Sequence, residues 1–176
     1  DSFYMQEPGA LQGIKVLSTA DVSPGNTVDV AGIISGAGAE RYINLSTGSV
    51  IKTTPGPGVP GLVTLSNSSI GGVQLNSYTP GVVGGLGPNN LGLYILAWGK
   101  VTQRDPSLQY FYIDSGEGLR DGTLTGGAEN VGVRVIADPT NYPAGSYVAV
   151  TGISSCFSSG GLRPRILPTA IQLLNP

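Results

Sequence analysis

Two stretches of one pattern decide the fold: residues 145–154, GSYVAVTGIS, and residues 25–34, GNTVDVAGII. They align without a gap at a constant offset of 120 residues, from 25 to 145. In both, apolar and polar residues alternate with a period of two, the pattern of a half-buried β-strand. A glycine also stands at the same place in each, Gly32 and Gly152. We therefore interpret the chain as two copies of one β module.

Further blocks repeat in the same order. FYID at 111–114 and GVRVI at 132–136 precede the second stretch, while FYMQ at 3–6 and GIKVL at 13–17 precede the first. A looser match relates RYI at 41–43 to RPRI at 163–166. Chance could produce one such block in a chain rich in valine and glycine, but not several in one order. The ordered matches therefore support the duplication.

Composition places the chain in the all-β class. Of 176 residues, 28 are glycine and 13 are proline; only 11% are charged, and 40% are hydrophobic. That apolar content can bury enough surface to fold, which a disordered chain of similar glycine and proline content cannot. Many short alternating segments separated by turn signals predict small barrels or sandwiches with little or no helix. A long segment, residues 93–103, carries Gly99 at its middle, where a bend would let one strand serve both faces of a small barrel.

The second copy resembles a known family. Residues 98–101 (WGKV), 111–119 (FYIDSGEGL), 132–135 (GVRV) and 145–153 are similar to the OB-fold-like tandem repeats of secreted bacterial surface proteins, whose signatures are FYIDDGSG, GVRV and GDxVxVTG. The resemblance covers residues 91–174 well and 1–52 in part. It departs at Ser115 and at the shortened turn 6–9. It implies an OB-like barrel and an extracellular or cell-surface location, and it implies no catalytic residues.

We therefore predict two OB-like small β-barrels joined by a Gly/Pro-rich ordered connector. The N-terminal module, 1–52, lacks its own first strand; the connector or arm is 53–90; the C-terminal module is 91–176. Three sources could fill the missing strand position: residues 61–66 of the connector, a strand of a neighbouring molecule, or sequence removed when the chain was excised. The connector is more apolar than a flexible tether requires, so we expect it to pack as an arm. The candidate strand-donor or assembly residues are Leu62, Val63, Leu65, Val82 and Val83.

Missing residue types exclude several chemistries. The chain has no histidine and one cysteine, Cys156, so it cannot build a Ser-His-Asp triad or a zinc site from those residues. The eleven acidic residues are scattered. We expect no enzyme, no catalytic residues and no cofactor. We also expect no metal site: Asp114, Glu117 and Asp121 would suit calcium chemically, but a hairpin turn is the preferred interpretation.

Charge and hydropathy limit the partners. A net charge of −2 without a basic run argues against nucleic acid. No apolar stretch reaches about 18 residues, so we expect no membrane span. The leading hypothesis is a non-enzymatic extracellular structural protein that associates with copies of itself, as oligomers or a filament. The alternative is an accessory module of a secreted protein that binds carbohydrate or single-stranded nucleic acid. Its ligand face would comprise Tyr94, Trp98, Tyr110 and Tyr112.

Overall fold

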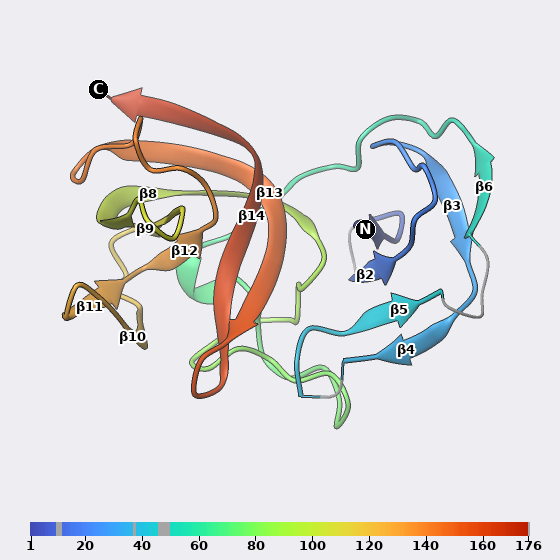
Figure 1. Cartoon of the computed structure of the whole chain (residues 1–176), viewed down its shortest axis with the longest axis horizontal. Coiled ribbons are helices and arrows are strands. Elements are labelled where there is room, and N and C mark those ends of the chain that lie inside the picture. The colour runs from blue at the N-terminus through green and yellow to red at the C-terminus, as the bar shows by residue number, and fades with distance from the viewer. Residues whose placement is uncertain (10–11, 37, 46–49, 176) are drawn as a thin grey trace.

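The computed structural model of the chain describes residues 1–9, 12–36, 38–45 and 50–175. Among them the only helical element is a single 3-10 turn, η1 (Asn67–Ser69), and all other regular structure is strand, which confirms the all-β class (Figure 1). The strands are β1 (Ser2–Gln6), β2 (Gly13–Leu17), β3 (Thr27–Val30), β4 (Ile33–Ser35), β5 (Tyr42–Asn44), β6 (Val50–Thr54), β7 (Val63–Thr64), β8 (Tyr94–Asp105), β9 (Tyr110–Asp114), β10 (Arg120–Thr125), β11 (Ala128–Val131), β12 (Val133–Val135), β13 (Tyr147–Ser158) and β14 (Leu162–Asn175). The described part of the chain holds no helix both long and apolar enough to cross a membrane.

Five strands close into a small barrel, hereafter the C-terminal barrel. Their order is β13-β14-β12-β9-β8, and β8 also pairs with β13, so the sheet has no free end. The long strand β8 makes this closure. Its first half, Tyr94–Lys100, pairs with β13, and its second half, Lys100–Asp105, pairs with β9. Gly99 sits at the changeover, where a Cβ atom would lie 2.7 Å from the backbone carbon of Asp114, so a residue with a side chain does not fit there.

The interior of the C-terminal barrel is filled by alternate side chains of its strands, as the period of two predicts. Its fully buried members are Ile95, Ala97, Val101, Phe111, Ile113, Val133, Val135, Val148, Val150 and Ile166. Three of them, Ile95, Ala97 and Val101, come from β8. The closing strand therefore supplies both a double row of backbone hydrogen bonds and part of the core.

The connector packs on the C-terminal barrel. β7 pairs in parallel with the start of β8, with Val63 opposite Ile95, and Ile70 is fully buried in the barrel core. This corrects the hypothesis that residues 61–66 complete the N-terminal module of their own chain. The physical reason is that the β8–β9 ladder covers only the second half of β8, from Lys100 onward. The first half of β8 thus keeps one open edge, and β7 occupies it.

The first six strands form the N-terminal module. They make a four-stranded sheet of order β1-β2-β5-β4 and a two-stranded sheet of β3 and β6. Every ladder in this module repeats a ladder of the C-terminal barrel in the same register. Phe3 faces Val16 as Phe111 faces Val135. The other equivalent pairs are Lys15↔Tyr42 with Arg134↔Arg165, Ile34↔Ile43 with Ser154↔Ile166, and Val28↔Lys52 with Val148↔Leu173.

Even the irregularities repeat. The register slips between Thr27 and Val28 in the β3–β6 ladder, and between Tyr147 and Val148 in the β13–β14 ladder, which is the same place at an offset of 120 residues. A shared register and a shared bulge position mean that residues 25–35 and 145–155 occupy equivalent places in two copies of one module. The structure thereby supports the internal duplication inferred from sequence.

The two modules lie side by side and touch directly (Figure 1). The side-chain oxygen Oε1 of Gln6 accepts a hydrogen bond of 2.8 Å from the backbone N–H of Tyr94. Close by, Gly13 of β2 meets Gly92 so closely that a Cβ atom on Gly13 would lie 2.3 Å from the Gly92 carbonyl carbon. The absence of side chains at this pair of glycines sets how near the modules approach.

We expect Gly13→Ala to lower the free energy of unfolding by about 1–3 kcal/mol, the usual cost of over-packing. The added methyl group would meet backbone on the other side, which cannot rotate away. Gly61→Ala is the matched control, because an added Cβ there meets no atom within 4 Å. Urea unfolding followed by circular dichroism measures the stability of both variants. Equal stability of the two would contradict a close contact between the modules at Gly13 and Gly92, the place that we call the seam.

Candidate functional site: an open strand position in the N-terminal module

The N-terminal module has two sheet edges that its C-terminal counterpart does not have. β1 pairs only with β2, and β4 pairs only with β5, so both are edge strands among the residues that the structure describes. Their equivalents, β9 and β13, are bridged by β8. No described strand takes the place of β8 in the N-terminal module. We call this gap between β1 and the β3–β4 edge the open strand position.

The side chains that line the open strand position match those of a closed barrel in kind but not in burial. The seven positions equivalent to the non-β8 core residues are Phe3, Met5, Ile14, Val16, Val28, Val30 and Ile43. Their counterparts in the C-terminal barrel all have an exposed fraction of 0%. In the N-terminal module only Val16 is fully buried, and the other six are half-buried. The module thus has the lining of a barrel interior without the strand that would cover it.

The strands beside the open position are also shorter. Where the C-terminal barrel has one continuous strand, β13, the N-terminal module has β3 and β4 separated at Ala31 and Gly32. β13 is held by hydrogen bonds on both edges, to β8 and to β14. Among the described strands, the β3–β4 segment pairs along one edge, with β6 and β5. Loss of one ladder explains why the same sequence pattern yields a broken strand here.

We expect the same substitution to cost different amounts in the two copies. Val148→Ala removes two methyl groups from a sealed core and should lower the free energy of unfolding by about 2 kcal/mol. Val28→Ala, at the equivalent place, should cost less than about 1 kcal/mol, because Val28 is half-buried and gains less from burial. Denaturation monitored by amide hydrogen exchange separates the two modules. A cost for Val28→Ala as large as that of its partner would mean that the N-terminal interior is already sealed.

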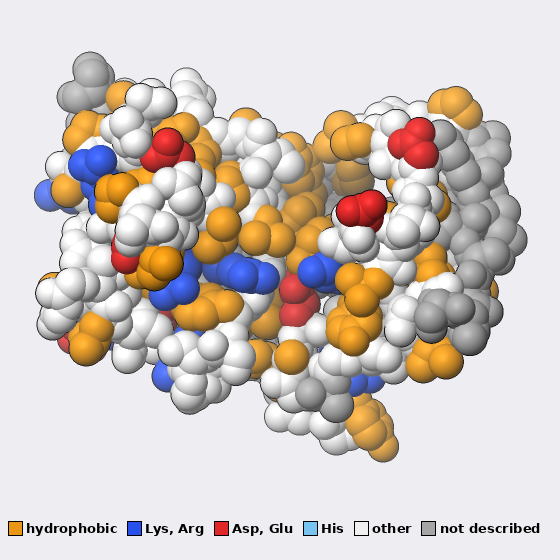
Figure 2. All heavy atoms as spheres, in the orientation of Figure 1, with side chains coloured by type: hydrophobic (Ala, Val, Ile, Leu, Met, Phe, Trp, Pro, Cys, Tyr) orange, Lys and Arg blue, Asp and Glu red, His pale blue; other side chains and the backbone are white. Residues whose placement is uncertain are grey.

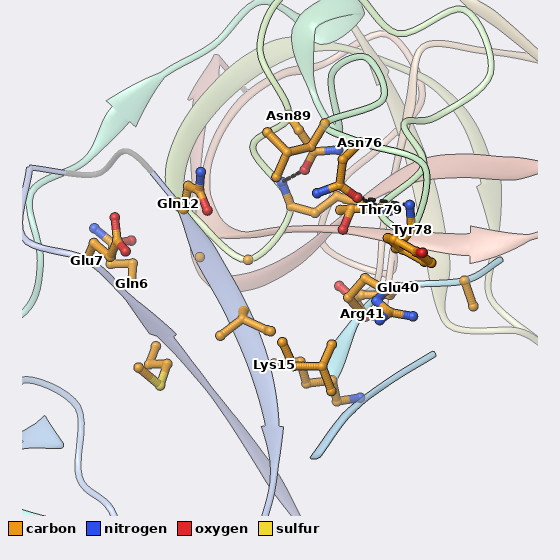
Figure 3. A pocket seen from close by; sticks show the side chains of 18 residues that line it. Gln6, Glu7, Gln12, Lys15, Glu40, Arg41, Asn76, Tyr78, Thr79 and Asn89 are labelled. Atoms are coloured by element: carbon orange, nitrogen blue, oxygen red, sulfur yellow. Dashed lines mark hydrogen bonds between the residues drawn. The ribbon is translucent and has the colours of Figure 1, made fainter. Parts of the chain in front are cut away.

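A cavity of about 450 Å³ lies where the N-terminal module, the connector tip and the start of the C-terminal barrel meet (Figure 3). Met5, Ile14 and Ile34 supply apolar lining, and the connector contributes Tyr78 and Asn89. The charged lining residues are Glu7, Lys15, Glu40 and Arg41, two of each sign, so the cavity has no charge preference for an anion or a cation. Its volume suits a small molecule.

Two titratable groups near the contact between the modules, Tyr4 and Cys156, are held in their neutral forms. Burial, reinforced by the nearby Glu40 carboxylate, raises the pKa of the Tyr4 hydroxyl well above its ordinary value. That hydroxyl donates to the two Glu40 oxygens at 3.1 Å. Burial likewise raises the pKa of the Cys156 thiol to about 12, so it stays a protonated, unreactive group among Val82, Leu91 and Leu162.

The predicted aromatic ligand face is only partly available. Tyr112 is fully buried and Tyr110 nearly so, which corrects the expectation that both lie open for stacking. The β10–β11 hairpin covers them: Tyr112 donates a 3.0 Å hydrogen bond to Asp121, and the Tyr110 and Thr125 hydroxyls lie 3.0 Å apart. Trp98 is 48% exposed and Tyr94 half-buried, so these two remain at the surface.

Sequence reasoning missed both the hairpin and the residue that stacks on these rings. The guanidinium of Arg134 lies 4.3 Å from the Tyr110 ring centre and 3.8 Å from that of Phe157. Its Nε also donates to the Tyr112 hydroxyl at 2.9 Å. The hairpin was signalled by the Gly-Gly pair at 126–127 between alternating segments. Nothing local to Arg134 signals its stacking, because the partners come from β9 and β13.

The three acids considered for calcium serve other contacts. Asp114 accepts a hydrogen bond from the backbone of Gly118, and Asp121 is buried against Thr123 and Tyr112. Glu117 accepts from the N–H and the hydroxyl of Ser68 in the connector, at 2.8 and 2.9 Å. No cluster of three potential metal-ligating side chains occurs in the described ranges. The three acids thus do not converge, and Glu117 instead ties the connector to the C-terminal barrel.

The Glu117 contact predicts acid sensitivity of the connector. Partial burial opposes ionisation, but the hydrogen bonds from Ser68 outweigh it and hold the pKa of Glu117 below its usual value. A lowered pKa in the folded state means that the stabilisation is present above the unfolded-state pKa and is lost as the pH falls through the folded value. Because Glu117 is exposed, we expect less than about 1 kcal/mol. Protection of the amides of residues 66–70 from hydrogen exchange should fall in wild type as the pH drops below the ordinary range of a glutamate carboxyl, and Glu117→Gln should flatten that dependence. Equal pH dependence of the two proteins would contradict this role.

The five predicted assembly residues divide into two groups. Val63 and Leu65 pack against the core of the C-terminal barrel, and Val82 is buried with Leu91 and Leu162. Leu62 and Val83 are 47% and 48% exposed. The connector therefore uses its buried members to dock on its own chain, and only Leu62 and Val83 remain at the surface.

Comparisons of the chain with protein-family models, with curated proteins and with solved structures found no match.

Proposed function

We propose that this protein is a non-enzymatic, extracellular structural subunit that associates with copies of itself. The single observation that carries the proposal is the open strand position: two free sheet edges beside a half-covered apolar interior. Exposed edges are templates for pairing, and proteins that keep them normally blunt them with charge or cover them. Here the edge strand β4 instead carries Ile33 and Ile34, each 59% exposed. Such a surface favours association.

Further apolar surface lies outside the N-terminal module. Side chains about half exposed or more line the connector and the β8–β9 turn: Val59, Leu62, Val73, Leu75, Tyr78, Val83, Leu86 and Leu108. Figure 2 shows hydrophobic side chains on both modules, with basic and acidic side chains between them near the middle of the face. Large exposed apolar area marks sites of contact between proteins.

The form of the assembly follows from the geometry of the contact. When a neighbouring molecule fills the open strand position, the donor contributes its strand and the acceptor contributes a different surface, its two open edges. The contact is therefore head-to-tail. A head-to-tail contact that does not close into a ring generates a filament. The extracellular location is supported by the resemblance to secreted surface repeats and by the low charge of a Gly- and Ser-rich chain. The lack of histidine supports a non-enzymatic role.

We expect wild-type protein to form ordered oligomers or filaments as its concentration rises, measured by light scattering and electron microscopy. Val30→Asp places a carboxylate in the interior of the N-terminal module and should abolish assembly. Leu124→Asp is the control, since Leu124 is 62% exposed on the β10–β11 hairpin, which lies outside the surfaces named above. A protein that stays monomeric at all concentrations, or a Val30→Asp variant that assembles like the control, would overturn the proposal.

The seam cavity favours a second candidate function, an accessory module that binds a small polar ligand such as a sugar. Its volume of about 450 Å³ and its mixture of Tyr78 with amide side chains suit such a ligand. Screening glycans against the monomer by calorimetry separates the two candidates. Saturable glycan binding by a particle that never assembles would favour the accessory module.

A further inference from the structure

We infer that the open strand position accepts an extended strand of another polypeptide with the residue pattern of β8. That pattern is apolar residues at alternate positions, the second of them small, then glycine, then a further apolar residue, as in Ile95, Ala97, Gly99 and Val101. The inference deepens the proposed function and rests on it for the natural source of the strand, a neighbouring copy.

The C-terminal barrel is the template for the bound state. Each ladder of the N-terminal module has its counterpart there in the same register, so the acceptor side is already in place. Among the strands that the structure describes, the ladders without a counterpart are those made by β7 or β8 and by the β10–β11 hairpin. A strand added in the place of β8 would supply the ladders that the N-terminal module lacks relative to the C-terminal barrel.

The interior specifies the inward-facing side chains of the incoming strand. The seven acceptor positions are Phe3, Met5, Ile14, Val16, Val28, Val30 and Ile43, and their counterparts are Phe111, Ile113, Val133, Val135, Val148, Val150 and Ile166. Five of the seven are the same residue, and the other two exchange one aliphatic side chain for another of similar size. A lining of nearly the same shape accepts side chains like Ile95, Ala97 and Val101, which fill it in the C-terminal barrel.

Direction and register follow from the same equivalence. The incoming strand runs antiparallel to both edges, as β8 does. Its first half lies opposite residues 28–33 and its second half opposite residues 2–6. The glycine falls beside Gln6, the counterpart of Asp114, whose backbone excludes a side chain at Gly99. Such a strand gains two rows of main-chain hydrogen bonds while it buries alternate side chains, which is how strand addition becomes tight.

No strand among the residues that the structure describes is free to take this position. Within the described residues, β8 is enclosed in its own barrel and β7 is paired with β8. β7 also has only two residues, too few to span both edges of the open strand position. Removing either strand would expose the core of the C-terminal barrel, at a cost that the new contacts would have to exceed. A segment that is not already paired is therefore the better donor.

The chain supplies its own probe for this inference. A synthetic peptide of residues 92–105, GLYILAWGKVTQRD, carries the whole of β8. Added to dilute monomeric protein, it should bind saturably in calorimetry and slow amide exchange in β1, β3 and β4. Peptides with Ala97→Asp or Gly99→Val are controls of the same length, and each should bind at least tenfold more weakly, because one puts a charge inside and the other a side chain where none fits.

Acceptor variants locate the binding. Val30→Asp should lose the peptide, while Met5→Ile, which restores the residue found at the equivalent Ile113, should retain it. Unchanged Trp98 fluorescence in both shows that the C-terminal barrel remains folded. The inference is overturned if the peptide does not bind, if the control peptides bind as well, or if the slowed amides lie in β9 and β13, which would mean exchange with the resident β8.

These outcomes are separable from those of self-association. If the protein assembles but does not bind the peptide, the proposed function is supported and this inference is wrong. If the protein binds the peptide in the predicted register but never assembles, this inference is supported, the proposed function is wrong, and the natural donor is a different chain.

Discussion

The double ladder made by β8 is the interaction on which the structure depends. One strand, bonded to β13 along its first half and to β9 along its second, closes five strands into a barrel and places Ile95, Ala97 and Val101 in its core. It also provides the edge on which β7 and the connector dock. The N-terminal module repeats the remaining ladders and has no such strand within the described residues. The difference between a sealed and an open copy therefore comes from one element.

The consequences extend from local structure to energetics. Without the second ladder, the strand equivalent to β13 divides into β3 and β4. Without the inward side chains of β8, six of seven core-type residues stay half-buried. Apolar area left in contact with solvent is stabilisation not realised, at roughly 25 cal/mol for each Å². A strand that covered the half-buried interior of the N-terminal module would bury this area and gain that stabilisation, which is a physical basis for association.

Much of the fold was predictable because its signals are local or repeated. Period-two alternation identified the strands, the all-β class was confirmed, and the long strand with Gly99 at its middle, expected to serve both faces of a small barrel, pairs with β13 on one side of that glycine and with β9 on the other. The duplication was visible because registers conserved in space leave matching blocks in sequence. The hypothesis that residues 61–66 fill the missing strand position of their own N-terminal module was wrong. Alternation identifies a strand but not the sheet edge that the strand joins. That edge depends on where β9 stops along β8. The burial of Tyr110 and Tyr112 was missed for a similar reason, since their cover comes from Arg134 and from a hairpin later in the chain.

The central claim is that the N-terminal module is a barrel with one strand position open. Residue-resolved amide hydrogen exchange of the dilute monomer tests it most directly, by comparing β1 and residues 28–33 with their counterparts, β9 and residues 148–153. The account predicts that β1 and residues 28–33 exchange at least a hundredfold faster, because an open edge leaves amides in water that β8 protects in the other copy. Equal protection of the two pairs of strands in the monomer would contradict it.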